Sequence, residues 1–190
     1  AADRVRVFAS GLRNANGMAF EPTTGKLWTV VNERDDIGDD TPPDYLTSVA
    51  DGGFYGWPCS YWGKIVDERV QPQRPDLVAR SITPDYALGT HTAALGLAYY
   101  EGTGLPEPFR RGMIIGQHGS WNRKAYSGYK VIFVPFENGR PNGPPVDLLA
   151  GFVKDDGSGE VSGRPVGVAV DKEGAVLVAD DAGDTIWRVK

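Results

Sequence analysis

The sequence is poor in the residues that build the commonest metal and disulfide sites. Cys59 is the only cysteine, and His91 and His118 are the only histidines, among 190 residues. One cysteine excludes an intramolecular disulfide, and it also excludes zinc sites built from several thiolates. Two histidines exclude a site with three imidazole ligands. The cysteine count therefore leaves the cellular compartment open.

Basic runs and long apolar runs are also missing. The formal net charge is −5, and no cluster of Lys and Arg has the density that releases counterions from nucleic acid. The longest apolar stretches, such as residues 131–134, are strand-sized. They fall well short of the roughly 20 residues that cross a bilayer. We therefore expect neither a nucleic-acid partner nor a membrane span.

Glycine and proline, in contrast, are abundant. The chain has 25 Gly and 14 Pro, and its hydrophobic fraction of 41% is sufficient for a folded core. This composition suits many short strands joined by tight turns. No segment keeps a 3.6-residue apolar period, so the sequence predicts an all-β protein in which helix is minor.

Three segments repeat one pattern, in which a Gly opens an alternating apolar strand and a turn leads to a second one. They cover residues 17–31, 96–115 and 167–179, and further strands are predicted at 131–136 and 185–189. A short outer strand or a turn is expected in 3–12 and in 44–50. The repeats are longer than the roughly 40–50 residues of compact propeller repeats, and loops at 63–92 and 137–164 account for the excess. Such units are propeller blades or a tandem sandwich.

Polar residues gather at one end of each predicted hairpin. Arg13-Asn14, His91-Thr92 and Arg164 precede the three first strands. Residues 32–36, 117–123 and 180–181 follow the three second strands. Because these ends share an edge in a hairpin, we expect them to meet at one face, the mouth of the channel in a propeller. The opposite ends, 21–25 and 171–174, are plain turns.

The residue types at this edge suit an anionic ligand and a hard cation. Arg binds carboxylates in a bidentate fork, and calcium takes carboxylate and carbonyl oxygens. Each residue also has a plainer interpretation as a solvated turn residue or a structural histidine. The acidic segment 155–159 resembles a calcium loop only loosely, lacks the EF-hand spacing, and is better interpreted as a solvated loop.

The least generic part of the sequence lies between residues 11 and 63. It reads GLRN at 11–14, GMAF at 17–20, NERDD at 32–36, PDYL at 43–46 and GGFYGWP at 52–58. In this order the elements resemble the glucose/sorbosone dehydrogenase family, which are quinoprotein six-bladed propellers. QHGSWNR at 117–123 and GRPVG at 163–167 are similar to its sorbosone-dehydrogenase-like branch. The resemblance implies that residues 1–190 form about three four-stranded blades, the C-terminal half of such a propeller.

The resemblance implies two cofactors, pyrroloquinoline quinone (PQQ) and Ca²⁺, and assigns residues to each. Backbone carbonyls of Asp35 and Asp36 correspond to calcium ligands, and a structural calcium is expected near Asp44 and Tyr55. Val166 replaces a second cofactor-side arginine, and a cofactor lysine has no clear match, although His118 or Arg123 could substitute for it. The residues implied to contact the quinone are Arg13, Asn14, Arg34, His91, His118, Arg164 and Asp180.

The implied activity is oxidation of CH–OH or aldehyde groups of sugars, of the aldose or sorbosone type, with electrons passed to an acceptor. The family's catalytic histidine belongs to the N-terminal half, so no catalytic residue is assigned here. Three explanations for the half-propeller stay open: a fragment of a longer polypeptide, a cleaved or incomplete half, and a homodimer that closes the ring. Two other functions also stay open, a calcium-dependent lactonase-type hydrolase and a non-catalytic carbohydrate-binding propeller. The family implies a periplasmic or secreted location.

Overall fold

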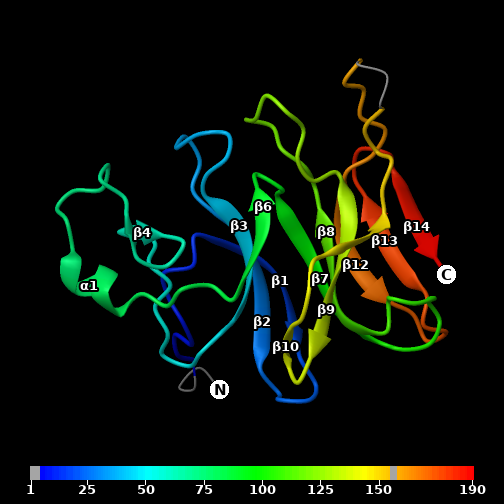
Figure 1. Cartoon of the computed structure of the whole chain (residues 1–190), viewed down its shortest axis with the longest axis horizontal. Coiled ribbons are helices and arrows are strands. Elements are labelled where there is room, and N and C mark those ends of the chain that lie inside the picture. Colours follow the sequence, from blue (N-terminus) through cyan, green and yellow to red (C-terminus); the bar gives the residue numbers. More distant parts are fainter. Residues whose placement is uncertain (1–4, 155–157) are drawn as a thin grey trace.

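The protein, seen in a computed structural model that describes residues 5–154 and 158–190, consists of antiparallel sheets set side by side (Figure 1). Within these residues helical structure is limited to α1 (Pro75–Arg80) and isolated turns, which confirms the prediction of an all-β protein. No helix in the described part is long and apolar enough to span a membrane.

Three sheets follow one another along the chain, and a small hairpin lies outside them. The first sheet has the order β1 (Asn14–Phe20), β2 (Leu27–Asn32), β3 (Pro43–Ser48), β6 (Tyr86–Thr90). The second contains β7 (Ala94–Glu101), β8 (Arg111–Gln117) and β9 (Lys130–Glu137), with β10 (Arg140–Pro141) and β11 (Val146–Leu149) paired to β9. The third is β12 (Pro165–Val170), β13 (Val176–Asp180), β14 (Thr185–Val189). The hairpin of β4 (Ser60–Tyr61) and β5 (Ile65–Val66) precedes α1.

The strands of the predicted repeat are confirmed, but four strands lie where the sequence predicted only loops. β5 and β6 fall in segment 63–92, and β10 and β11 fall in segment 137–164. The first sheet has the four strands expected of a blade, whereas the second has five and the third has three in the described part. Residues 5–12 form no strand, and only Ser10 pairs there, in a parallel bridge with Phe54. Within 44–50 the chain does form a strand, β3, but this strand lies between β2 and β6, and the outermost strand of the sheet is β6.

The repeated glycines let the inner strands β1, β7 and β12 approach each other closely. A Cβ atom on Gly17 would lie 2.5 Å from the Leu97 amide nitrogen in β7, and one on Gly96 would lie 2.3 Å from the Val166 carbonyl oxygen in β12. Any larger side chain would push these backbones apart, so the repeat glycine reflects strand packing. At Gly167 the nearest atom to such a Cβ is 3.9 Å away.

Two apolar clusters lie on either side of the second sheet. In β8, Met113 and Ile115 belong to the cluster shared with the first sheet, whereas Ile114 belongs to the cluster shared with the third. All three are 0% exposed, as expected for a strand covered on both faces. Each such side chain contributes roughly 1.5–3 kcal/mol of burial free energy.

The outer faces of the first and third sheets have apolar side chains with nothing packed on them in the described part. Met18 and Phe20 on β1 are 65% and 68% exposed, and Ile186 on β14 is 72% exposed. An apolar groove of about 240 Å³ runs beside Met18, between β1 and residues 7–12. The array of sheets therefore has two open borders, one at the first sheet beside β1 and one at the third sheet beside β14.

Candidate functional site

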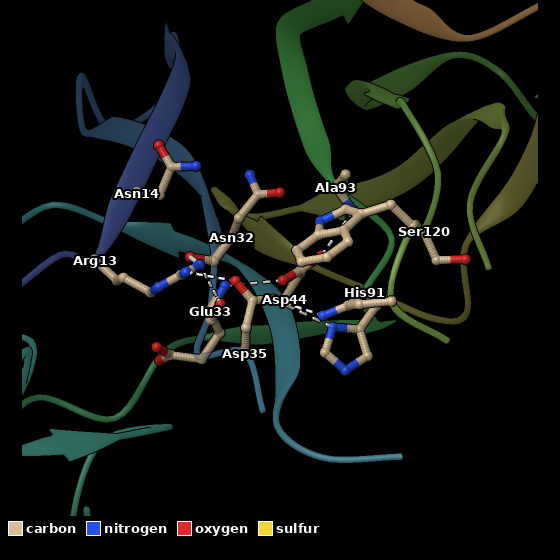
Figure 2. Close-up of a pocket in the computed structure, with 11 residues that line it drawn as sticks. Arg13, Asn14, Asn32, Glu33, Asp35, Asp44, His91, Ala93 and Ser120 are labelled. Atoms are coloured by element: carbon tan, nitrogen blue, oxygen red, sulfur yellow. Dashed lines mark hydrogen bonds and ion pairs between the residues drawn. The ribbon is translucent and has the colours of Figure 1, made fainter. Parts of the chain in front are cut away.

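A polar pocket lies where the ends of the first two sheets meet (Figure 2). Its volume is about 140 Å³. Five of the predicted site residues line it, together with residues that the sequence did not single out. The lining residues are Arg13, Asn14, Asn32, Glu33, Asp35, Asp44, His91, Ala93, Ser120, Trp121 and Asn122.

Arg13 anchors the loop that follows β2. Its Nη1 donates to the carbonyl oxygens of Asn32 and Glu33, and its Nη2 donates to Asp35 Oδ2 at 2.6 Å. Figure 2 shows this guanidinium pointing toward the Asp35 carboxylate. The arginine therefore shapes the loop and places a positive charge in the pocket.

The Asp35 carboxylate joins three segments that are distant in sequence. Besides Arg13 from the start of β1, it accepts a hydrogen bond from Asn122 Nδ2 at 2.9 Å, which comes from the loop after β8. His91 Nδ1 lies 3.7 Å from Asp35 Oδ1. These contacts all use the side chain of Asp35, whereas its backbone carbonyl accepts a hydrogen bond from a different residue.

The backbone carbonyls of Asp35 and Asp36 both contact the cationic side chain of Arg69. Arg69 Nη1 donates to the carbonyl oxygens of Asp35 and Asp36, each at 3.2 Å. Asp36 has a φ of 63°, the left-handed conformation, which non-glycine residues adopt rarely and mostly at turns and functional sites. The guanidinium is a stand-in for a positive ion at the two carbonyls predicted to hold calcium. The donor set therefore fits a hard cation.

Asp67 holds Arg69 in this position. Its carboxylate is 2% exposed and accepts from Arg69 Nε and Nη2 at 3.0 Å each. The hydrogen bonds from Arg69 lower the pKa of Asp67, against an opposing effect of burial. Arg34 Nε also pairs with Asp67, at 2.5 Å. Asp67 and Arg69 could not be predicted as site residues, because both lie in the insertion between β3 and β6.

Arg34 points away from the pocket. Its guanidinium stacks 4.0 Å from the centre of the Trp57 ring, and its Nη2 donates to the Pro58 carbonyl at 3.0 Å. The pair with Asp67 completes its contacts. The structure therefore gives Arg34 to the packing of the GGFYGWP element, and not to the pocket lining that the family resemblance implied.

His91 forms the pocket wall with its backbone in an unusual conformation. The residue is 8% exposed and has a φ of 54°, and Ala93 has a φ of 50°. His91 Nε2 lies 2.9 Å from the Gly38 carbonyl oxygen, to which it donates. Conformations of this kind cost about 1–3 kcal/mol each and cluster at binding sites. The fold therefore fixes the imidazole beside Asp35.

Asp44 and Tyr55, predicted to lie near a structural calcium, are engaged in other bonds. Asp44 is 4% exposed and accepts from the amides of Glu33 and Ala93 and from Thr92 Oγ1, at 2.9–3.0 Å. The Tyr55 hydroxyl donates to the Ser48 carbonyl at 2.6 Å and accepts from the Ala50 amide. Burial raises the pKa of both groups. Asp44 is thus a brace between the first sheet and β7, and the structure does not bring the two side chains together as ligands.

A second polar cluster forms where the third sheet meets the second. Arg164 donates from Nε to the His118 carbonyl at 2.9 Å and from Nη2 to the Gly119 carbonyl at 2.8 Å. His118 Nε2 lies 2.9 Å from Asp181 Oδ1. Neither Arg164 nor His118 lines the pocket. Arg164 instead fixes the loop on which Trp121 and Asn122 stand.

Asp180 is also a brace, because three donors of the chain surround its carboxylate. It is 3% exposed, and its carboxylate accepts from the amides of Arg164 and Gly183 and from Trp187 Nε1, at 2.7–3.0 Å. Burial acts to raise its pKa, but these donors lower it overall. The neighbouring Asp181, which contacts His118, is the exposed member of the pair.

Glu33 is a pocket residue that the sequence did not single out. It is 5% exposed, and burial raises its pKa although the amides of Arg34 and Trp62 donate to it. Among the described residues no group of three or more His, Cys, Asp or Glu side chains is arranged to hold a metal ion. The acidic loop mentioned above lies outside the described residues at positions 155–157.

The fold is therefore a series of open antiparallel sheets that pack through glycine-bearing inner strands, with a polar pocket at one end. Known proteins agree. The chain matches the glucose/sorbosone dehydrogenase family over residues 1–120 and a TrAA12-like family over residues 73–190. The chain therefore belongs to the glucose/sorbosone dehydrogenase family, as its sequence elements indicated.

Curated relatives match between about half and almost all of the chain. An uncharacterised protein of Borreliella burgdorferi is 31% identical over 185 residues, which are 96% of this chain and 48% of that protein. The aldose sugar dehydrogenase of Escherichia coli is 28% identical over 105 residues, 55% of this chain and 27% of that protein. The chain thus spans half or less of the length of these relatives.

Solved structures superpose well on this chain although their sequences are only 22–23% identical to it. A Trichoderma reesei carbohydrate-active enzyme of family AA12 superposes with a TM-score of 0.79 at 22% identity, covering 96% of this chain and 53% of that one. The PQQ domain of the Coprinopsis cinerea pyranose dehydrogenase, in its holo form, has a TM-score of 0.76 at 23% identity over 97% and 55%. These values establish the fold.

Proposed function

We propose that this chain is the cofactor-binding half of a PQQ- and calcium-dependent oxidoreductase that oxidises CH–OH or aldehyde groups of sugars. Membership of the glucose/sorbosone dehydrogenase family supports the reaction class. Relatives of the chain include a pyrroloquinoline quinone-dependent pyranose dehydrogenase, 28% identical over 68% of this chain. Under this proposal the second substrate is an electron acceptor, and the location is periplasmic or secreted.

The observation that carries the proposal is the pair of carbonyls that converge on Arg69. Two successive main-chain oxygens, those of Asp35 and Asp36, contact one guanidinium nitrogen at 3.2 Å each. Main-chain oxygens suit calcium, which binds six to eight oxygen ligands. Under the proposal Asp35 and Asp36 hold Ca²⁺, with Arg69 withdrawn toward Asp67.

The cationic and amide groups of the pocket suit the quinone, which is a tricarboxylate. Arg13 offsets negative charge, and Asn14 and Asn122 offer amide donors. The chemistry that these groups would supply when bound is hydride acceptance by the quinone and Lewis-acid polarisation by calcium. The task of this chain is to bind and orient that group, and it contributes no assigned base.

The pocket is too small to enclose the whole ligand. Its volume of about 140 Å³ is below the roughly 300–1,000 Å³ of pockets that surround a ligand. The exposed apolar side chains of Phe20 and Ile186 also support an incomplete site, because exposed sheet faces favour association. We therefore propose that further propeller sheets, from the rest of the protein or from a second copy, complete the site.

Reconstitution tests this function. Purified protein is titrated calorimetrically with PQQ in the presence and absence of Ca²⁺, and dye reduction is followed with aldoses, L-sorbosone and simple aldehydes. Calcium-dependent quinone binding supports the cofactor-binding half, and sugar-dependent dye reduction would show a complete enzyme. Protein that binds no quinone in either condition contradicts the proposal. Size-exclusion mass distinguishes a monomeric half from a ring closed by two copies.

The same titrations test the two other functions. A lactonase-type hydrolase would cleave lactones with calcium and without quinone. A non-catalytic propeller would bind saccharides without either cofactor. No specific contact in the described part favours either function over quinone binding.

A further inference from the structure

Trp121 leaves a large apolar ring in water at the rim of a polar pocket. The residue is 77% exposed although it lines the pocket. Arg13 and His91, which also line it, have side chains only 23% and 6% exposed. The charged groups thus lie deeper, and the indole lies at the entrance. Exposing such a ring costs hydrophobic free energy, so its position needs an explanation.

The loop around Trp121 is fixed on both sides. The Ser120 amide donates to the Ser127 carbonyl at 2.9 Å, and the Tyr129 hydroxyl donates to the Ser120 carbonyl. On the other side, Asn122 donates to Asp35 at 2.9 Å, and Arg123 Nε donates to the Asp39 carbonyl at 2.9 Å. The loop therefore presents the indole from a fixed position.

The open borders of the sheet array do not explain this exposure. Phe20 and Ile186 are exposed because they stand on β1 and β14, at the two borders. Trp121 instead follows β8, in the second sheet, which has packed sheets on both sides. A sheet that covered either border would extend the array sideways. A molecule that enters the pocket mouth would therefore meet the indole.

The surroundings of the indole define the chemistry of that occupant. Asn14, Asn32 and Asn122 line the same pocket as the apolar ring, and an amide side chain can both donate and accept hydrogen bonds. The Nδ2 groups of Asn32 and Asn122 already donate to Ala94 and Asp35, so these two residues offer a ligand mainly their acceptor oxygens. A ligand that matches this surface has one flat apolar face and a rim of hydroxyl groups. A pyranose ring has that shape, whereas an open-chain polyol or a small aldehyde lacks the flat C–H face.

We propose that Trp121 is a substrate-positioning platform that stacks on the C–H face of a pyranose ring, so that the preferred substrates are cyclic aldoses. This inference rests on the proposed function, since it assigns the deeper charged groups to the cofactor. Aromatic rings with a fixed orientation provide large contact area at low entropic cost.

The test compares two ligands on three variants of the protein. D-glucose and sorbitol are titrated calorimetrically into wild type, Trp121→Ala, Trp121→Phe and Phe20→Ala, each with and without PQQ and Ca²⁺. Phe20 is the matched control, because it is a 68% exposed aromatic on a border strand. Glucose affinity should fall roughly tenfold or more in Trp121→Ala, as for a binding hot spot, and stay within about threefold in Trp121→Phe and Phe20→Ala. Sorbitol affinity should be the same in all four proteins.

The outcomes separate this inference from the proposed function. Wild type that binds no glucose, or equal glucose affinity in wild type and Trp121→Ala, overturns the platform. A loss of quinone affinity in Trp121→Ala with glucose affinity unchanged also overturns it, because the indole would then stack on the cofactor. If wild type binds glucose through Trp121 but binds no quinone, the platform holds and the proposed function fails. Thermal unfolding of Trp121→Ala, unchanged from wild type, excludes a folding defect.

Discussion

Asn122 donates a 2.9 Å hydrogen bond to the carboxylate of Asp35 across 87 positions of sequence. The bond joins the loop after β8 in the second sheet to the loop after β2 in the first. Since Asp35 also binds Arg13, one carboxylate fixes the entrance loop and the carbonyl pair relative to each other. The two halves of the pocket are therefore coupled.

Replacing Asn122 by Ala should loosen this coupling. Loss of a hydrogen bond to a charged acceptor costs about 1.5–3 kcal/mol when buried, and this bond is only partly buried, so a loss of about 1 kcal/mol is expected. Urea unfolding measures it, with Asn142→Ala as the control because Asn142 makes a similar but exposed bond to Glu137. Equal losses of unfolding free energy in the two variants would show that the Asn122–Asp35 bond stabilises the protein no more than an exposed hydrogen bond does.

Replacing Arg69 by Ala should strengthen calcium binding. The Arg69 guanidinium occupies the carbonyls of Asp35 and Asp36, so a cation must displace it. Removing this competitor should raise the Ca²⁺ affinity by roughly tenfold, a common size for coupling between two ligands. Calorimetric titration with Ca²⁺ measures the change. Arg74→Ala, which removes an exposed arginine paired with Asp76, should leave it unchanged. Weaker binding in Arg69→Ala would mean that Arg69 shapes the loop and does not compete.

Glu33 should make the protein less stable as the pH rises. Burial raises its pKa above the ordinary 4.5, so the folded state binds a proton more readily than the unfolded state does. The contribution of Glu33 to the free energy of unfolding is therefore fully present below pH 4.5 and is lost as the pH rises through the raised pKa. Glu33→Gln should flatten this decrease in urea unfolding between about pH 4 and 8, and Asp44, shifted in the same direction, should leave a residual slope.

Glu21 is the control of opposite sign. Burial acts to raise its pKa, but hydrogen bonds from Thr23 and Thr24 lower it overall. Its stabilisation is present above pH 4.5 and is lost as the pH falls through the lowered pKa. Glu21→Gln should therefore reduce stability at neutral pH and flatten the acid side of the profile. Identical profiles for the Glu33 and Glu21 variants would contradict both assignments.

Sequence periodicity was sufficient for the inner strands and insufficient for the outer ones. β1, β7 and β12 alternate apolar residues behind a repeat glycine, and the family elements fall in the same places. β6 could not be recognised, because an insertion separates it from β3, with which it pairs. Only one of its five residues, Leu88, is buried, so the strand has no clear apolar pattern of its own. Its conformation depends on pairing with β3.

The polar edge could be predicted as a whole, but not the task of each residue. Arg13 and Arg34 both flank a strand of the first sheet, yet Arg13 lines the pocket and Arg34 stacks on Trp57. Asp35 faces the pocket, whereas Asp180 is enclosed by three donors. These differences depend on which neighbour a side chain reaches, and a strand pattern contains no information about neighbours from other segments.

The three repeat glycines give the last prediction, because their surroundings differ. Alanine at Gly17 or Gly96 places a Cβ within 2.5 Å of the backbone of the next inner strand, and should destabilise the protein by about 1–3 kcal/mol. Alanine at Gly167 meets its nearest atom only at 3.9 Å, so the change should stay within about 0.5 kcal/mol for the chain by itself.

The same Gly167→Ala variant tests whether another sheet completes the ring. If a further inner strand packs on β12 as β12 packs on β7, Gly167 faces it as Gly96 faces β12. The substitution should then weaken association with the completing half, or with a second copy, while the folding of this chain is unaffected. Sedimentation of wild type and variant over a range of concentrations measures this. An association as strong in Gly167→Ala as in wild type would mean that no strand approaches β12 as closely as the repeat requires.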